Sequence, residues 1–326
     1  MSKFIARQVK VGVAKEATRN VPVAPAILVP FNSFGFDDSV VMPRSTVGLG
    51  VLDDASDSFV TTKFGEGSLA GELRDQSIGY FLYSLLGSLS TTGPTDTSAY
   101  THVFSVLHTV LHPSLSLRVS DVNTTEMYGL VMPKTLSIAA SLNEIVKMTL
   151  EFLSRKGRIW ENTVLNVTPE NRFTKKHIQV KVAAARADLA AATALCVKNL
   201  TLTINQNAAI DDCMGTAEPE DIINGPLSIE GEMTLNYTDE TWKNYMRDGS
   251  KKAMSIAFIN NDVLIGATTR PSLTLIFPRV DFFPWKPNYN LNELTTQTVS
   301  FKALRDETNN EDNIYSATLV NTKLSY

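Results

Sequence analysis

The sequence predicts a mainly β chain built from two similar modules, each with one α-helix. Many short segments alternate apolar and polar residues, as strands with one buried face do. Two segments, residues 77–86 and 240–247, instead place apolar residues at helical spacing. The surroundings of the two helices also follow one plan, because GEGSLAGELRDQSIGYFLYSLLG at 65–87 and GPLSIEGEMTLNYTDETWKNYMRDG at 225–249 both read as a strand, a short helix and a glycine stop.

Short matches between the two halves occur in the same order along the chain, which indicates an internal duplication. The difference in residue number between a segment and its match falls from the first match to the last. The first copy therefore has the longer connections, and loops tolerate such insertions better than packed strands do. We therefore predict a first module at 1–155, a linker at 156–176 and a second module at 177–326. The matches are Gln8–Val11 with Gln179–Val182, Gly71–Leu73 with Gly231–Met233, Pro113–Leu117 with Pro271–Leu275, and Thr149–Phe152 with Thr298–Phe301.

In the first module the alternation predicts seven strands and the helix. The helix begins after a cap at Asp75 or Ser77 and ends at Gly87, because Ser and Asp accept hydrogen bonds from first-turn amides and Gly tolerates the left-handed stop. The segment 88–98 is rich in Ser, Thr and Gly and is predicted as a loop. The predicted strands are 7–15, 26–29, 68–73, 100–106, 115–119, 135–140 and 145–152.

The segment from Asn32 to Thr62 shows no periodicity and contains several Asp, Gly and Pro residues. It is too long for a simple connection in a compact domain, so we predict a long loop that is either a functional arm or disordered. A shorter counterpart is expected around 207–224.

In the second module, Thr238 or Asp239 is expected to cap the helix, which ends at Gly249. The cluster Phe282-Phe283-Pro284-Trp285 is flanked by further prolines, so we expect it to pack against a neighbour rather than to extend a sheet. The predicted strands are 178–182, 200–204, 225–233, 253–259, 272–277, 296–303 and 315–320.

Composition narrows the function classes. The 326 residues are 43% apolar and 20% charged with a net charge of −4, and lysine and arginine do not cluster as tight phosphate binding requires. The N-terminal segment lacks the apolar core of a signal peptide and no run is long enough to span a membrane, so we expect a chain that stays in the cytoplasm where it is made, with no membrane partner. Cys196 and Cys213 are expected to be reduced.

The search for catalytic chemistry finds no convincing set. His108 and His112 lack the Glu of a zinc protease motif and are read as two unconnected histidines. Gly65, Gly67 and Gly71 have the wrong spacing for a phosphate loop and are read as turn glycines. Five acidic residues without calcium-loop spacing are read as solvated charges, and the Trp242–Tyr245 pair is read as core rather than a base-stacking platform. We expect no catalytic, cofactor or metal site. The acidic residues are Asp37, Asp38, Asp53, Asp54 and Asp57.

In the order of its predicted elements and the composition of its segments, nearly the whole chain resembles the tail tube proteins of long-tailed bacteriophages. The segments that carry the resemblance are GELRDQSIGYFLYSLLG, GEMTLNYTDETWKNYMRDG and PSLTLIFPRVDFFPWKPNYNLNE. The resemblance implies β-sandwich or barrel-like modules with a flanking helix, whose strands join across subunits into rings that stack into a hollow tube. It also implies a structural virion protein of the tail that conducts the genome into the host, with other tail proteins as partners and viral DNA passing without specific binding.

Family members usually have one module and form hexamers, so a duplicated chain favours a trimeric ring with pseudo-sixfold symmetry over a true hexamer. We expect a neutral or negative lumen. Loop 32–62 is expected to join stacked rings through Phe31, Phe34, Phe36 and Val40, and Phe282, Phe283 and Trp285 are expected to pack between subunits. The alternatives are another tail or baseplate component, a carbohydrate-binding or adhesive β protein, and an enzyme whose site is assembled from distant residues.

Overall fold

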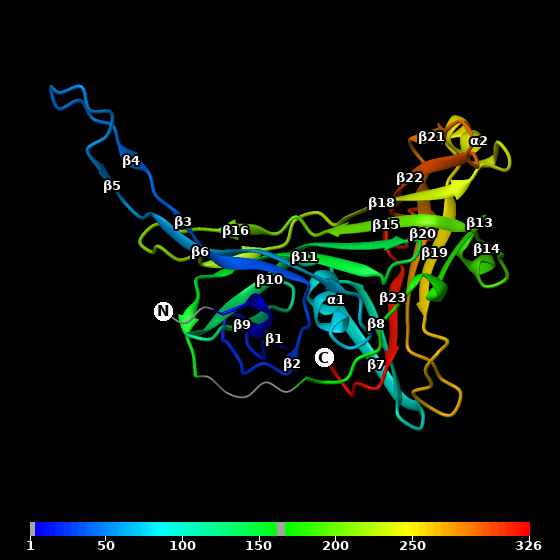
Figure 1. The fold of residues 1–326 in the computed structure, drawn as a ribbon, viewed down its shortest axis with the longest axis horizontal. Coiled ribbons are helices and arrows are strands. Elements are labelled where there is room, and N and C mark those ends of the chain that lie inside the picture. Colours follow the sequence, from blue (N-terminus) through cyan, green and yellow to red (C-terminus); the bar gives the residue numbers. More distant parts are fainter. Residues whose placement is uncertain (1–3, 162–166) are drawn as a thin grey trace.

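The computed structural model describes residues 4–161 and 167–326, and these form a mainly β chain, as predicted (Figure 1). Its main sheets are antiparallel, and two α-helices accompany them in the described ranges. Both helices match the prediction: α1 spans Ile78–Leu86 and α2 spans Thr241–Asp248. The same described ranges contain three short 3-10 helices, at Ala6–Gln8, Lys175–His177 and Arg186–Leu189.

The longest sheet passes through both halves of the chain in the order β3–β6–β11–β10–β15–β18–β22–β21. Along most of these strands buried and solvent-facing residues alternate, so one face packs on the core and the other is polar. The strands are β3 (Ser33–Val41), β6 (Thr62–Glu72), β11 (Lys147–Arg155), β10 (Thr125–Ser141), β15 (Val197–Asn205), β18 (Ser228–Asn236), β22 (Thr296–Leu304) and β21 (Trp285–Asn288).

Two further sheets complete the sides of the molecule. Strands β10 and β20 each belong to two sheets, and the register shifts where each bends, as a β-bulge allows. One sheet adds β2 (Ile27–Leu28), β1 (Lys10–Lys15), β9 (Leu115–Ser120) and β12 (Arg158–Ile159) to β10. The other contains β14 (Ala194–Leu195), β13 (Ile178–Ala183), β19 (Lys252–Ile259), β20 (Ser272–Asp281), β23 (Ser316–Asn321), β8 (Ala99–Val106) and β7 (Gly87–Asp96).

Paired strands follow the same order in the two halves of the chain. In the first half β1 pairs with β9, followed by β10, β11, β6 and β3. In the second half β13 pairs with β19, followed by β20, β22, β18 and β15. The sequence order of these strands is also the same, with α1 directly after β6 and α2 directly after β18. The β7–β8 hairpin has no counterpart in the second half.

Strand partners align the halves differently from the sequence matches. Thr149–Phe152 and Thr298–Phe301 occupy equivalent places, since Phe152 lies opposite Gly67 and Phe301 opposite Gly231. Gly231 therefore corresponds to Gly67, not to Gly71. The Pro113 and Pro271 segments form β9 and β20, which hold different places in the two orders. Short strand motifs recur easily, because alternation alone makes unrelated strands look alike.

Close approach of the neighbouring backbone explains why both equivalent positions are glycine. A Cβ on Gly67 would lie 2.0 Å from the carbonyl oxygen of Gly35 on β3. A Cβ on Gly231 would lie 2.4 Å from the carbonyl oxygen of Thr201 on β15. Gly65, Gly67 and Gly71 all lie within β6, with a φ of 151° at Gly67, so the interpretation of these three residues as turn glycines is wrong. Because neither glycine has a side chain, the backbone of β6 can approach that of β3, and the backbone of β18 can approach that of β15.

One continuous cluster of buried apolar side chains contains residues from both halves, because β10 and β15 join them in a single sheet. The segment between the halves takes part in the packing. Phe173 is fully buried with its ring centroid 6.1 Å from that of Phe258, and Asn171 donates two hydrogen bonds to Asp75. Residues 162–166 of the predicted linker lie outside the described ranges.

Three segments differ from the prediction. Residues 32–62 are not a structureless loop but the β3–β6 hairpin, extended by β4 (Arg44–Ser45) and β5 (Asp57–Ser58). The predicted loop 88–98 contains β7, which pairs with β8. Trp285 begins β21 and so extends a sheet. Glycine, proline and aspartate have low strand propensity, so the sequence pattern does not predict strands in these segments. Pairing with a neighbouring strand overrides this local propensity.

Candidate assembly surfaces

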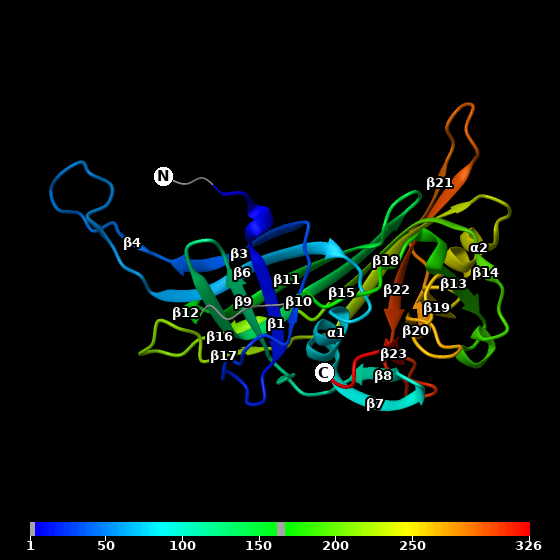
Figure 2. The ribbon, with the colours of Figure 1, turned by 60° about the horizontal axis from the view of Figure 1, so that its bottom comes forward.

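The most prominent surface is the tip of the β3–β6 hairpin, residues 42–61, which projects from the body of the molecule (Figures 1 and 2). We name this tip the long arm. Most of its apolar side chains are exposed, and Leu52 is fully exposed. A group of uncovered apolar side chains marks an interaction surface. The exposed apolar residues of the arm and its base are Val40, Val41, Met42, Val47, Leu49, Val51, Leu52, Phe59 and Val60.

The four residues predicted to join rings lie at the base of this hairpin, in different environments. Phe36 is buried, and its ring meets Tyr128 edge to face at 4.8 Å between centroids. Phe31 and Phe34 are half-buried and touch each other at 5.6 Å. Val40 is exposed. Phe36 thus belongs to the core of its own chain, and an apolar contact surface on this hairpin has to begin at Val40.

A second, shorter arm spans residues 207–224 and contains β16 (Ala209–Asp211) and β17 (Asp221–Ile223). It lies on the first half of the chain: Arg19 forms a 2.7 Å ion pair with Asp221, and the Asn224 amide donates to the Val110 carbonyl. An apolar cluster lies beneath it, formed by Leu130, Met132, Leu153, Ala208 and Ile222. The shorter arm therefore shows how an arm from one half covers the neighbouring half.

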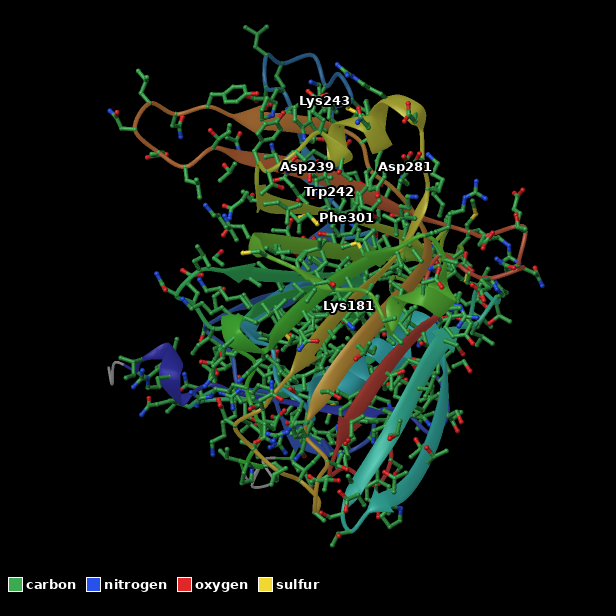
Figure 3. The ribbon with its side chains drawn as sticks, turned by 90° about the vertical axis from the view of Figure 1, so that its right-hand side faces the viewer. Lys181, Asp239, Trp242, Lys243, Asp281 and Phe301 are labelled. Carbon is green, nitrogen blue, oxygen red and sulfur yellow. The ribbon has the colours of Figure 1, made fainter. Side chains whose placement is uncertain are left out.

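The aromatic cluster predicted to pack between subunits is divided by the fold. Phe282 is fully buried, with its ring centroid 5.1 Å from that of Trp242 on α2. Phe283 is 67% exposed. Trp285 is half-buried, and its Nε1 donates to Gln297 at 2.8 Å. Figure 3 shows α2 beside the β21–β22 hairpin, with Trp242 labelled on the helix. Phe282 is therefore a core residue, whereas Phe283 faces solvent.

The polar face of the long sheet is the third surface. It presents Ser, Thr and Asn side chains with exposed glutamates at Glu66, Glu151, Glu230 and Glu232. Two of its exposed lysines are paired, Lys302 with Glu230 at 2.6 Å and Lys147 with Glu144 at 2.9 Å. The sequence shows each strand's alternation but not the strand order, so sequence reasoning missed this face.

Among the described residues no group of three or more His, Cys, Asp or Glu is arranged to hold a metal ion. His108 is exposed and 3.0 Å from Asp312, whereas His112 is buried and hydrogen-bonds the carbonyls of α1, so the two histidines are unconnected, as predicted. Cys196 and Cys213 are both exposed free thiols. None of the helices that the structure describes is long and apolar enough to cross a membrane.

The family model described as phage tail tube protein matches residues 6–303, nearly the whole chain. The chain therefore belongs to the phage tail tube protein family. It is a structural component of a bacteriophage tail, where it assembles with itself and with other tail proteins. A search of curated proteins found no match. The family assignment supports the tail tube over the adhesive and enzymatic alternatives considered above.

Proposed function

We propose that the chain forms rings that stack into a hollow tail tube, with three chains in each ring and pseudo-sixfold symmetry. The observation that supports this proposal is the division of the long sheet into two equal groups of four strands. The first half contributes β3, β6, β11 and β10, and the second contributes β15, β18, β22 and β21. Three such chains supply the six modules with which single-module relatives close a ring.

In this proposal, residues 1–155 and 177–326 are duplicated modules joined by 156–176. The shared partner order and the equivalent glycines Gly67 and Gly231 support a common origin. The continuous core is compatible with duplication, because two modules that share a sheet also share the layer beneath it.

The polar face of the long sheet lines the tube in this proposal, and the genome passes along it. A wall that held phosphates tightly would need free lysines or arginines, which release counterions on binding DNA. On this face exposed lysines are no more numerous than exposed glutamates, and Lys147 and Lys302 already pair with carboxylates. We also propose a purely structural, non-enzymatic role, which the tail tube family assignment supports.

The experiment that tests the ring is negative-stain imaging of the purified chain followed by mass measurement of one ring. Three chains of 35.8 kDa give a ring of about 107 kDa. A ring of twice that mass would overturn the trimer but keep the tube. A monodisperse chain that forms neither rings nor tubes would overturn the tube itself.

We also propose that the long arm joins stacked rings, because its uncovered apolar residues need a partner surface. Replacing residues 44–58 with a short Gly/Ser link removes β4 and β5 but keeps the β3–β6 pairing. Rings are then expected without tubes, with the far-ultraviolet circular dichroism preserved. If rings also fail to form, the long arm acts within a ring, as the shorter arm acts between the halves. Tubes of normal length would make the long arm passive.

A further inference from the structure

The long sheet has two unpaired edges, one at each end. Within the described ranges β3 pairs only with β6, and β21 pairs only with β22. Figures 1 and 2 show these two strands at opposite ends of the molecule. An unpaired strand edge exposes backbone N–H and C=O groups that can bind a strand of another chain. Edges at opposite ends can join copies head to tail, which gives a ring when the rotation closes.

A finished junction of this kind lies inside the chain, between β10 and β15. These strands pair antiparallel over seven positions, from Thr135 opposite Asn205 to Ser141 opposite Asn199. The Gln206 amide continues the ladder by donating to the Lys134 carbonyl at 2.9 Å. The β10–β15 pair is the contact that joins the four-strand group of the first half to that of the second.

Strand β21 holds the place in the second half that the end of β10 holds in the first. Leu136 of β10 lies opposite Leu150, and Trp285 of β21 lies opposite Val299, the residue equivalent to Leu150. The side of β10 that β15 covers is open on β21. The second half thus presents the edge of a junction whose other strand is missing.

Strand β3 holds the place of β15. Gly35 approaches Gly67 as Thr201 approaches Gly231, so Phe36 corresponds to Leu202. The side of β15 that faces β10 is open on β3. The first half therefore presents the strand that the second half lacks, but on the far side of the molecule.

We propose that β21 of one chain pairs antiparallel with β3 of a second copy of this chain, in the register of the β10–β15 junction. The proposal rests on the ring proposed above and specifies its lateral contact. Transferring the internal register places Lys286 opposite Asp37 of the second copy. The other opposed pairs are Trp285 with Asp38, Pro287 with Phe36, Asn288 with Gly35 and Tyr289 with Phe34.

The charges on the two edges are complementary in this register. Lys286 and Asp37 are exposed, and neither has a salt-bridge partner in the part of the chain that the structure describes. Inside the chain the same pair of positions holds Ser137 and Thr203, whose hydroxyls lie 3.4 Å apart. Opposite charges placed directly across two strands stabilise the pairing, and like charges oppose it. The charged pair thus selects β21–β3 pairing over pairing of identical edges.

The core side of the junction is also complementary. Tyr289 is 69% exposed and Phe34 is half-buried in the free chain. Their internal counterparts, Ala140 and Leu200, are both buried. Pairing would cover both rings in the same way. Pro287 has no N–H to donate, so this junction has a weaker ladder than the internal one, as expected of an edge that must stay unpaired until a second copy arrives.

A charge-exchange experiment tests the register. Lys286→Asp places two negative charges opposite each other, and Asp37→Lys places two positive charges there, so each variant is expected to lose rings in negative stain. Both residues are exposed, so each variant is expected to stay folded by circular dichroism. The double variant restores opposite charges and is expected to form rings again. Glu151→Lys, exposed in the middle of the same sheet, is the control and is expected to assemble. Folded single variants that assemble like the parent chain, or a folded double variant that does not, would overturn the proposal.

Cysteine cross-linking separates this inference from the ring itself. Gly35 has free space around its Cβ position, so Gly35→Cys and Asn288→Cys can be combined in a chain that carries Cys196→Ser and Cys213→Ser. Mild oxidation is expected to link chains covalently up to three, about 107 kDa. Rings in negative stain without this cross-link would overturn the edge pairing but keep the tube. Cross-linked species of six chains would keep the edge pairing but overturn the trimer. A parent chain without rings would overturn the proposed function.

Discussion

The two halves of the chain use the same strand order, but their long strands end differently. In the first half β10 continues unbroken from Thr125 to Ser141 and is covered on one side by β15. In the second half the corresponding path is divided into β20 and β21 by Phe282, Phe283 and Pro284. The undivided strand β10 pairs with β15 inside the chain. The divided path instead ends in β21, a short edge strand that contains Pro287. The difference shows how one topology serves a covalent neighbour and, in the proposed ring, a separate chain.

The break between β20 and β21 offers the largest test of this comparison. Phe282→Ala is expected to lower the free energy of unfolding by about 3–5 kcal/mol, because it empties a fully buried site against Trp242. Phe283→Ala, at the exposed neighbouring position, is expected to change it by less than about 0.5 kcal/mol. Urea unfolding of both variants measures the difference. Equal losses would show that Phe283 also packs within the chain.

The paired glycines give the next largest effect. Gly67→Ala and Gly231→Ala each force a methyl group against a backbone carbonyl that the sheet holds in place, so each is expected to cost at least about 1–3 kcal/mol. Gly48→Ala is the control, since no atom lies within 4 Å of its Cβ position. Thermal unfolding of the three variants compares the halves. A tolerated alanine at Gly67 or Gly231 would mean that the two crossings are not equivalent.

The aspartates that precede the two helices, Asp75 and Asp239, contribute to the free energy of unfolding with opposite pH dependence. Burial raises the pKa of Asp75, ahead of α1, from 3.8 to about 6, although Asn171 donates hydrogen bonds to it. Hydrogen bonds from Thr241 lower the pKa of the exposed Asp239, ahead of α2. The folded chain therefore binds the Asp75 proton more tightly than the unfolded chain, and Asp75 favours folding by about 1 kcal/mol more at pH 5 than at pH 7. Asp239 acts with the opposite sign: its contribution is present above pH 3.8 and is lost as the pH falls.

Two variants isolate these contributions. Asp75→Asn is expected to remove a loss of stability that the parent chain shows as the pH rises from about 4 to 6. Asp239→Asn is expected to remove a smaller loss that appears at lower pH. The measurement is the urea midpoint of each variant relative to the parent chain from about pH 2 to pH 7, which covers both windows. The assignment to Asp75 fails if Asp75→Asn and the parent chain keep the same slope between pH 4 and 6.

Elements with a local residue pattern could be located from the amino-acid sequence alone. Apolar spacing and the glycine stops located α1 and α2, since Gly87 and Gly249 both adopt the left-handed conformation that ends a helix. Alternation located most core strands, and the order of the elements pointed to the tail tube family. These features depend on residues a few positions apart, so their physical causes can be read along the chain.

Strand pairing and the environment of individual side chains depend on contacts between distant parts of the folded chain. Residues 33–41 became a strand because β6 supplied its partners, despite the glycine and aspartates in that segment. Phe36 became core and Phe283 became surface, although both belong to aromatic clusters that look alike in sequence. The two open edges could be recognised only after β10 and β15 were seen to pair. Strand partners lie up to hundreds of residues apart, and a pattern with a period of two fits every strand in the sheet equally well.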